Sequence, residues 1–571
     1  MSIVDKEREA WINKGKAVLK PINGSRAIKF HGGTTVLWQI WILLEFIFTF
    51  STVWAEPESE VKGGAFVLPP VLSEPPGDQG KGKGSAISKI VFFGNHVIKS
   101  EDLEFHIAAF LHRPIQRIEL EQLRNSITQL YIQRGYVNSG AIVPDNAIHD
   151  GMLSIQIIEG AISETRFQGG NALNKRYLTS RLTRQGEPLN VNLLEERMRV
   201  LLTDPLFEQI NARLVPGSEL GSAILDINVK RARNFGLAFE ASNYQAPAVG
   251  SSFLGLSGWI RNLTTWGDVL DISARASEGS NHYDLGWEIP IVASRTLLNF
   301  RVARGSSSVI EEPLDSLNIE SEVNSEEIGL SHPIVDNARQ RFALGITYGN
   351  RENKTTLDGE PFSFVAGEQT GHTVVRDWRF HQDFLQRFDK HAISLRSTLI
   401  WGTNNIDGDP LVPGHPNRRF FLWTGQGQTS SSLWNGRAEL VSRIIYQHSK
   451  DTLTPVERVS LGGRYSVRGY RENQLVRDKG YLLSAELRWP ILGDMRSTQN
   501  LSLVPFLDYA SAANHGGASE KLASAGLGVQ WNFKRFDGEL FYGKQLKKPA
   551  SESNGDLQDH GIHARVRFKI F

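Results

Sequence analysis

The sequence contains no cysteine, and this absence excludes disulfide bonds, thiolate metal ligands and a cysteine nucleophile together. A chain without cysteine also suits passage through an oxidising compartment such as a periplasm. An excess of charge of one sign is missing as well, because 63 basic residues nearly cancel 62 acidic ones. The net charge therefore does not favour nucleic acid as a partner.

Long apolar runs are also scarce. The only one covers Val36 to Val53, and the basic residues ahead of it make it similar to the apolar core of a secretory signal peptide. We predict that residues 1–55 are a signal peptide with an extended n-region, cleaved after Ala55. The alternative is an uncleaved inner-membrane anchor. No later apolar run has the roughly 20 residues that a membrane helix needs, so a later membrane crossing must use strands.

N-terminal sequencing of the protein in the membrane fraction tests this cleavage. We expect the mature chain to begin at Glu56, because Ala55 supplies the small residue at which cleavage occurs. Recovery of an intact segment from Lys29 to Trp54 in inner-membrane fractions would instead support the anchor.

Two similar units follow a linker. Residues 56–86 are rich in Pro, Gly and Lys and are predicted to be that linker. At 87–160 and again at 161–234, the spacing of apolar residues predicts the order strand, helix, helix, strand, strand. Gly94-Asn95 ends the first strand of one unit, and Gly170-Asn171 stands at the matching place in the other. This repeat indicates two small α/β domains of the same type.

The character of the sequence changes at Phe235. From there to Phe571, segments that alternate apolar with small or polar residues are separated by Gly, Asn, Asp and Ser, as in the run from Tyr481 to Trp489. Nine of the 13 tryptophans lie in this part, as the aromatic girdles at bilayer interfaces require. The length of this part of the chain suits roughly 14 to 18 tilted strands. We predict a transmembrane β-barrel of about 16 antiparallel strands over 235–571, closed because lipid cannot satisfy free backbone amides.

Two motifs within this part resemble those of a known superfamily. One is similar to the V-R-G-Y/F tip of a loop that folds into the barrel in polypeptide-translocating and barrel-assembling outer-membrane proteins, and it consists of Val467, Arg468, Gly469 and Tyr470. The other, Phe506 and Asp508, matches the F-x-D strand motif of that superfamily, although Ala510 stands where F-x-D-x-G usually has Gly. The doubled unit resembles polypeptide-transport-associated (POTRA) domains. The whole set is similar to the two-partner secretion transporters of the haemolysin secretion/activation family.

This resemblance implies a translocator in the outer membrane of a bacterial-type cell, with two POTRA domains in the periplasm. The domains would capture an unfolded exoprotein, and the pore would export it. The expected partners are a large secreted haemolysin/haemagglutinin-like protein and outer-membrane lipid, and no nucleic acid. We expect no cofactor, metal or catalytic residue, since neither Gly-x-Ser-x-Gly nor His-Glu-x-x-His occurs. The alternative is a factor that assembles or inserts other barrels into the outer membrane.

The resemblance also implies an inward-folded loop near 462–478. An arginine at its tip can hold a carboxylate through two parallel hydrogen bonds, a fork that lysine cannot form. Asp508 is the expected partner of Arg468 if its side chain faces the lumen. We call the six motif residues the inward-loop lock: Val467, Arg468, Gly469, Tyr470, Phe506 and Asp508.

Overall fold

The computed structural model describes residues 66–67, 85–144, 147–170, 173–291, 295–407, 412, 414–495, 497–549 and 555–570. The predicted signal peptide at 1–55 lies outside these residues, as does most of the predicted linker at 56–86. The described parts of that linker are two short strands, β1 (Phe66–Val67) and β2 (Ser85–Ala86).

The first α/β unit places two helices against a small sheet. Its strands run in the order β3-β7-β5, with β6 beside β7. The helix α4 starts with a capping box, in which Gln116 and Glu119 each bind the other's backbone N–H, and it buries Leu123, Ile127 and Tyr131. The elements are β3 (Lys89–Phe93), α3 (Ser100–Ile107), the 3₁₀ turn η1 (Ala108–Phe110), β4 (Pro114–Ile115), α4 (Arg117–Gln133), β5 (Gly140–Ile142), β6 (Ile148–His149) and β7 (Met152–Ile158).

The second unit repeats the predicted order. Asn190 caps α6 by accepting hydrogen bonds from two backbone N–H groups, and the helix buries Leu194, Met198 and Leu201 in the domain core. Its elements are β8 (Ala161–Gly169), α5 (Lys175–Leu182), α6 (Val191–Leu202), β9 (Phe207–Pro216) and β10 (Ser222–Arg231). None of the helices in the described ranges is long and apolar enough to span a membrane.

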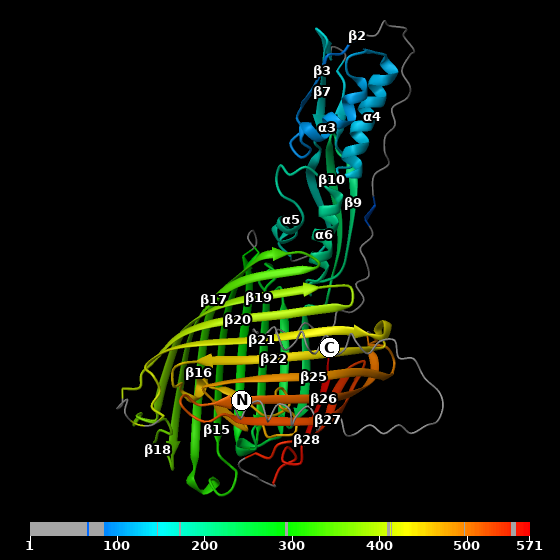
Figure 1. Ribbon diagram of the computed structural model, residues 1–571. Coiled ribbons are helices and arrows are strands. Elements are labelled where there is room, and N and C mark those ends of the chain that lie inside the picture. Colours follow the sequence, from blue (N-terminus) through cyan, green and yellow to red (C-terminus); the bar gives the residue numbers. More distant parts are fainter. Residues whose placement is uncertain are drawn as a thin grey trace, which may run out of the picture. The chain divides into compact units, whose positions relative to one another are not determined.

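The chain from Phe235 onward forms one closed antiparallel barrel of 16 strands, with the two-residue strand β18 added beside β17 (Figure 1). Antiparallel pairing of β11 with β29 closes the ring. The prediction of about 16 strands is thus confirmed. The strands are β11 (Phe235–Ser242), β12 (Phe253–Arg261), β13 (Val269–Ser277), β14 (Ser280–Ile291), β15 (Thr296–Ser308), β16 (Ile319–Asp336), β17 (Gln340–Leu357), β18 (Glu360–Pro361), β19 (His372–Arg387), β20 (His391–Asn404), β21 (Arg419–Leu433), β22 (Ala438–Ser449), β25 (Lys479–Leu492), β26 (Gln499–Ala513), β27 (Glu520–Phe533), β28 (Phe536–Gln545) and β29 (Ile562–Lys569). The 3₁₀ turns in the loops are η2 (Pro247–Val249), η3 (Asp315–Leu317), η4 (Trp434–Gly436) and η5 (Pro455–Glu457).

Along each strand, successive side chains point alternately to the outside and the inside of the barrel. On β25, Tyr481 and Trp489 are exposed, whereas Ser484 and Glu486 are buried. Large aromatic side chains are exposed on other strands too, and they include Trp378 and Trp401. An apolar exterior combined with a polar interior is the arrangement that a barrel immersed in lipid needs.

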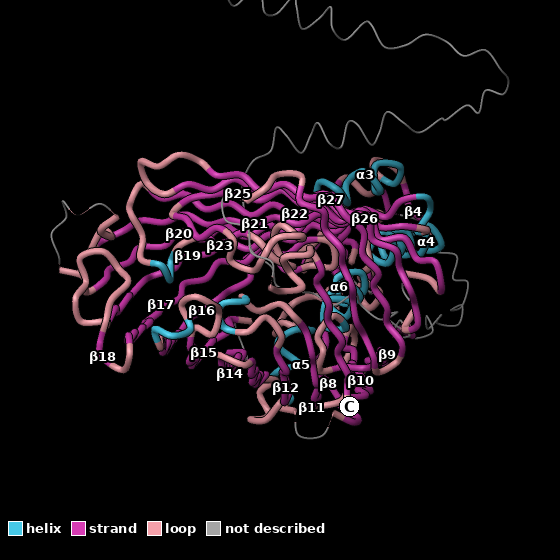
Figure 2. Tube along the Cα trace, turned by 90° about the horizontal axis from the view of Figure 1, so that it is seen from below, coloured by secondary structure: helices cyan, strands magenta, loops and turns pink. Residues whose placement is uncertain are grey.

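One connection of the barrel folds inward. It joins β22 to β25, and within it β23 (Val459–Leu461) pairs with β24 (Leu475–Arg477). Figure 2 shows β23 and the neighbouring loop inside the ring of strands. Val467 and Tyr470 of this loop are fully buried against inner-face residues of the wall such as Leu482 and Ala510. The strands alternate in direction around the ring, so this loop starts at the end of the barrel opposite to the one where β11 begins.

Candidate functional site

Arg468, at the tip of the inward loop, is fully buried against the inner faces of β25 and β26. Its Nε donates to Asp508 Oδ2 at 2.8 Å, and its Nη2 donates to Asp508 Oδ1 at 2.7 Å. The backbone N–H of Arg468 also donates to Asp508 Oδ2 at 3.0 Å. The two side-chain bonds form a fork, which holds the loop tip in orientation as well as in position.

The same guanidinium binds a second carboxylate. Nη1 of Arg468 donates to Glu486 Oε2 at 2.6 Å, and Nη2 donates to Ser484 Oγ at 3.2 Å. Glu486 is also bound by Arg488 from its own strand, at 2.8 Å. Arg468 is therefore the centre of a buried network on the wall, and most of its N–H groups have acceptors.

Aromatic rings cover the guanidinium of Arg468. Its Cζ lies 3.8 Å from the ring centroid of Phe506 and 5.2 Å from that of Phe541. The two rings themselves meet edge to face at 5.8 Å. Each ring attracts the cation through its π face and keeps water away from the ion pair, which strengthens the electrostatic attraction.

Gly469 and Tyr470 bring the loop backbone against the wall. Gly469 has φ of 91°, and a Cβ placed there would lie 2.6 Å from the carbonyl oxygen of Gly543 on β28. The hydroxyl of Tyr470 contacts the carbonyl oxygens of Ala523 and Lys547, and it accepts a hydrogen bond from the N–H of Ala523 at 3.2 Å. A glycine and a hydroxyl-bearing aromatic residue are therefore required at these two places.

The structure accommodates the departure from the motif at Ala510. This residue is fully buried and packs in the same apolar cluster as Val467, Tyr470 and Leu482. The methyl group of Ala510 therefore packs against the loop, and Tyr470 is fully buried in the same cluster. All six residues of the inward-loop lock thus lie together on one arc of the wall, on the loop tip and β26.

Sequence reasoning missed a second ion pair at the tip. Arg464 donates to Glu539 through Nε at 3.1 Å and through Nη2 at 2.6 Å, and its Cζ lies 4.0 Å from the ring centroid of Phe541. Arg471 forms a similar fork with Asp559 in the loop between β28 and β29. Both arginines lie within four residues of the motif at 467–470, and alternation turns Glu539 inward, but no pattern in the sequence pairs these arginines with their carboxylates.

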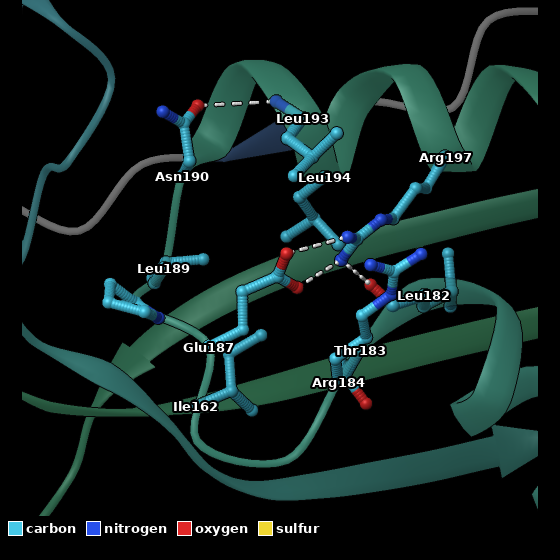
Figure 3. A pocket seen from close by; sticks show the side chains of 11 residues that line it. Ile162, Leu182, Thr183, Arg184, Glu187, Leu189, Asn190, Leu193, Leu194 and Arg197 are labelled. Carbon is cyan, nitrogen blue, oxygen red and sulfur yellow. Dashed lines mark hydrogen bonds and ion pairs between the residues drawn. The ribbon is translucent and has the colours of Figure 1, made fainter. Parts of the chain in front are cut away.

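A pocket in the second α/β unit is the other candidate site. It lies between β8, the end of α5 and the start of α6 (Figure 3). Its polar groups already bind one another, since Arg197 forms a fork with Glu187 at 2.7 and 2.9 Å and donates to the carbonyl of Leu182 at 3.1 Å. The ion pair ties the connection between the helices to α6, so we assign it a structural role. Across the described residues, no group of three or more His, Asp or Glu side chains is arranged to hold a metal ion.

Two family profiles match the sequence. The profile of the haemolysin secretion/activation protein ShlB/FhaC/HecB matches residues 221–531, which is more than half of the chain. The profile of the ShlB-type POTRA domain matches residues 85–160.

Individual proteins show the same likeness at low identity. The chain is 22% identical over 463 residues to the heme/hemopexin transporter protein HuxB of Haemophilus influenzae, which covers 77% of this chain and 79% of HuxB. It is 22% identical over 442 residues to the outer membrane transporter CdiB of Dickeya dadantii, over 75% of this chain and 76% of CdiB. Among solved structures, CdiB from Escherichia coli has the same fold, with a TM-score of 0.67 and 19% identity over 96% of this chain and 100% of that one.

Proposed function

Because the chain belongs to the haemolysin secretion/activation family, we propose that its periplasmic domains capture an unfolded exoprotein and that its barrel exports this exoprotein through the lumen. The protein is an outer-membrane transporter of the two-partner secretion type, with its POTRA domains in the periplasm. The observation that carries the proposal is the closed barrel whose lumen contains a loop tied to the wall by Arg468. Such a loop can close the pore at rest and leave a path when it moves.

The partner is a large secreted protein, and we infer that it is of the haemolysin/haemagglutinin type. The family is a transporter family, and we further infer that the chain performs no chemical reaction and needs no cofactor. Outer-membrane lipid surrounds the barrel in this proposal, which fits the apolar exterior. Nucleic acid has no role in it.

Capture of an unfolded chain is best served by strand addition, because hydrogen bonds to a sheet edge recognise backbone and tolerate a sliding substrate. The sheet of the first domain ends in β3 and β5, and β8 forms one end of the second sheet. These edge strands belong to domains whose cores are formed from their own apolar residues. Each domain can therefore keep its fold while an extended segment binds.

A soluble fragment of residues 87–232 is expected to bind the unfolded N-terminal part of the partner, because these residues contain both domain cores. Binding is measured by titrating the partner segment into the fragment, with a natively folded protein as the control ligand. A folded fragment that binds nothing at any tested concentration would contradict the receptor role.

Deletion of either domain is expected to stop secretion while the barrel still inserts, since the barrel closes through its own strands. Heat-modifiable migration of the outer-membrane barrel measures insertion, and the amount of partner in the medium measures secretion. The amounts of other outer-membrane barrels should stay unchanged. A fall in those amounts would instead support the assembly factor that is the alternative function.

A further inference from the structure

The inward loop makes a second contact with the barrel, far from its tip. Residues 450–458, which we call the base segment, connect β22 to β23 and end in η5. Leu453 of this segment is fully buried and packs against Val375 of β19, Ile400 of β20 and Leu422 of β21. The base segment thus lies on a stretch of wall that the inward-loop lock does not touch.

A cluster of charged side chains joins the base segment to this wall. Glu457, whose side chain is 4% exposed, forms an ion pair with Arg351 of β17. Arg351 Nη2 also lies 3.5 Å from Asp377 Oδ2 of β19 and 3.9 Å from Glu327 Oε1 of β16. Arg379 of β19 completes the set, since it pairs with Asp377 at 2.7 Å and with Glu327 at 2.9 Å. We call these five residues the second anchor.

The second anchor and the inward-loop lock occupy different walls. The anchor belongs to β16, β17 and β19, whereas the lock contacts β25, β26 and β28. In the strand order of the barrel, β20, β21 and β22 separate the two sets on one side, and β29 with β11 to β15 separate them on the other. The loop is therefore held at its base on one wall and at its tip on another. Figure 2 shows this loop inside the ring of strands. In the export function proposed above, a polypeptide would pass after the loop leaves one of these two walls.

We propose that the second anchor is the fastening that opens during export, while the inward-loop lock stays closed. The proposal rests on the export function proposed above. The composition of the cluster supports it: the second anchor places three carboxyl groups around two guanidinium groups, so the carboxylates outnumber their cations and repel one another. Departure of Glu457 leaves Arg351, Arg379, Asp377 and Glu327, a balanced set of two cations and two anions.

The exposure of the side chains to water also indicates that the second anchor separates first. In the inward-loop lock, the side chains of Arg468 and Asp508 are both 0% exposed, so separation would leave two buried charges unpaired. In the pair of the second anchor that must separate, the side chains of Arg351 and Glu457 are 17% and 4% exposed, so water can reach the cation and replace part of the lost contact. The second anchor is therefore the easier of the two to separate.

Internal bonds let the base segment move as one piece. Asp478, at the far end of the inward loop, accepts hydrogen bonds from the N–H of Leu453 and from Nε of Arg458, each at 3.0 Å. These bonds do not involve the second anchor, so they can persist when Glu457 leaves Arg351. The opening then requires the loss of the ion pair between Glu457 and Arg351, of the apolar contacts around Leu453, and of the hydrogen bonds that join the base segment to β21 and β22.

Conductance of the full chain in planar phosphatidylcholine bilayers tests this anchor without any partner protein. Glu457→Gln and Arg351→Ala should each raise the fraction of time in the open state several-fold. The matched control is Arg396→Ala, which removes a fork between Arg396 of β20 and Asp383 of β19 on the wall and leaves the loop contacts intact. The control should conduct like the wild type. Wild-type conductance in both anchor variants would overturn the proposal.

A reversible cross-link tests which fastening must open during export. The chain has no cysteine, so Arg351→Cys with Glu457→Cys provides one defined pair for a cleavable bis-maleimide. Export should stop when this pair is linked and return when the linker is cleaved. The control variant, Arg396→Cys with Asp383→Cys, should export both before and after linking. Export at the unlinked rate from the linked anchor would overturn the proposal. Failure of the unlinked wild type to export would count against the proposed function instead, and the conductance result would then decide the anchor by itself.

Discussion

Replacement of Arg468 by alanine is expected to reduce secretion of the partner by about tenfold or more, because the buried Asp508 loses its cation and the buried Glu486 loses one of its two cations. Asp508 loses a fork, and Glu486 loses the shorter of its contacts with arginine. Removing one member of a buried pair costs roughly 3–5 kcal/mol, whereas an exposed pair would cost about 1 kcal/mol or less. The side chains of Arg468 and Asp508 are both 0% exposed, so the larger cost applies.

Further variants of Arg468 and Asp508 distinguish bidentate hydrogen bonding from electrostatic attraction alone. Asp508→Ala should be less severe than Arg468→Ala, because Arg468 keeps Glu486 as a partner. The double variant should be little worse than Arg468→Ala, since both changes break the same interaction. Arg468→Lys keeps the charge but cannot form the fork, so a substantial defect in this variant indicates that geometry matters.

The measurement for this series is the amount of partner in the medium, with outer-membrane barrel levels held equal. A matched control is Arg396→Ala, which breaks a fork on the barrel wall without touching the loop. Wild-type export from both Arg468→Ala and Asp508→Ala would refute the inward-loop lock.

Gly469→Ala is expected to abolish most secretion although it changes no charge. A Cβ at this position would lie 2.6 Å from the backbone oxygen of Gly543, and a backbone atom within a strand cannot move aside. The positive φ of 91° adds strain for any residue with a side chain. The loop tip must therefore withdraw from β28, and Arg468 next to it loses its alignment with Asp508.

The chain offers a control that has the strain without the clash. Gly516, in the loop between β26 and β27, has φ of 69°, and a Cβ there would meet nothing within 4 Å. Gly516→Ala should secrete nearly as well as the wild type, and both variants should insert as heat-modifiable barrels. Equal secretion by the two variants would show that the close approach of Gly469 to Gly543 does not matter for export.

The periodicity of the sequence was sufficient to predict the architecture. A period of two turns alternate side chains to opposite faces, so runs such as Tyr481 to Trp489 predict strands with one apolar face, and the structure has such a strand in β25. Helical spacing likewise predicts α4 and α6, because Leu123 and Ile127 fall on one face of α4, and Leu194 and Met198 fall on one face of α6. These features depend on near neighbours in the chain, and local spacing encodes them directly.

The candidate site was only partly predictable. The motifs with Arg468 and Asp508 indicate both members of one ion pair, and the structure brings them together. The partners of Arg464 and the role of Glu457 could not be predicted, because each meets a carboxylate or guanidinium that lies far away in the sequence.

Local sequence thus determined that the chain has two α/β units and a barrel, and the resemblance of its motifs to those of a known family implied an arginine at the tip of an inward loop. Only the tertiary structure decided that the loop is held at two places, at its tip by Arg468 on one wall and at its base by Glu457 on another. The physical reason is that contacts across a lumen depend on the order and register of all the strands around the ring. Alternation specifies which side chains face inward, but it does not specify which of them face one another.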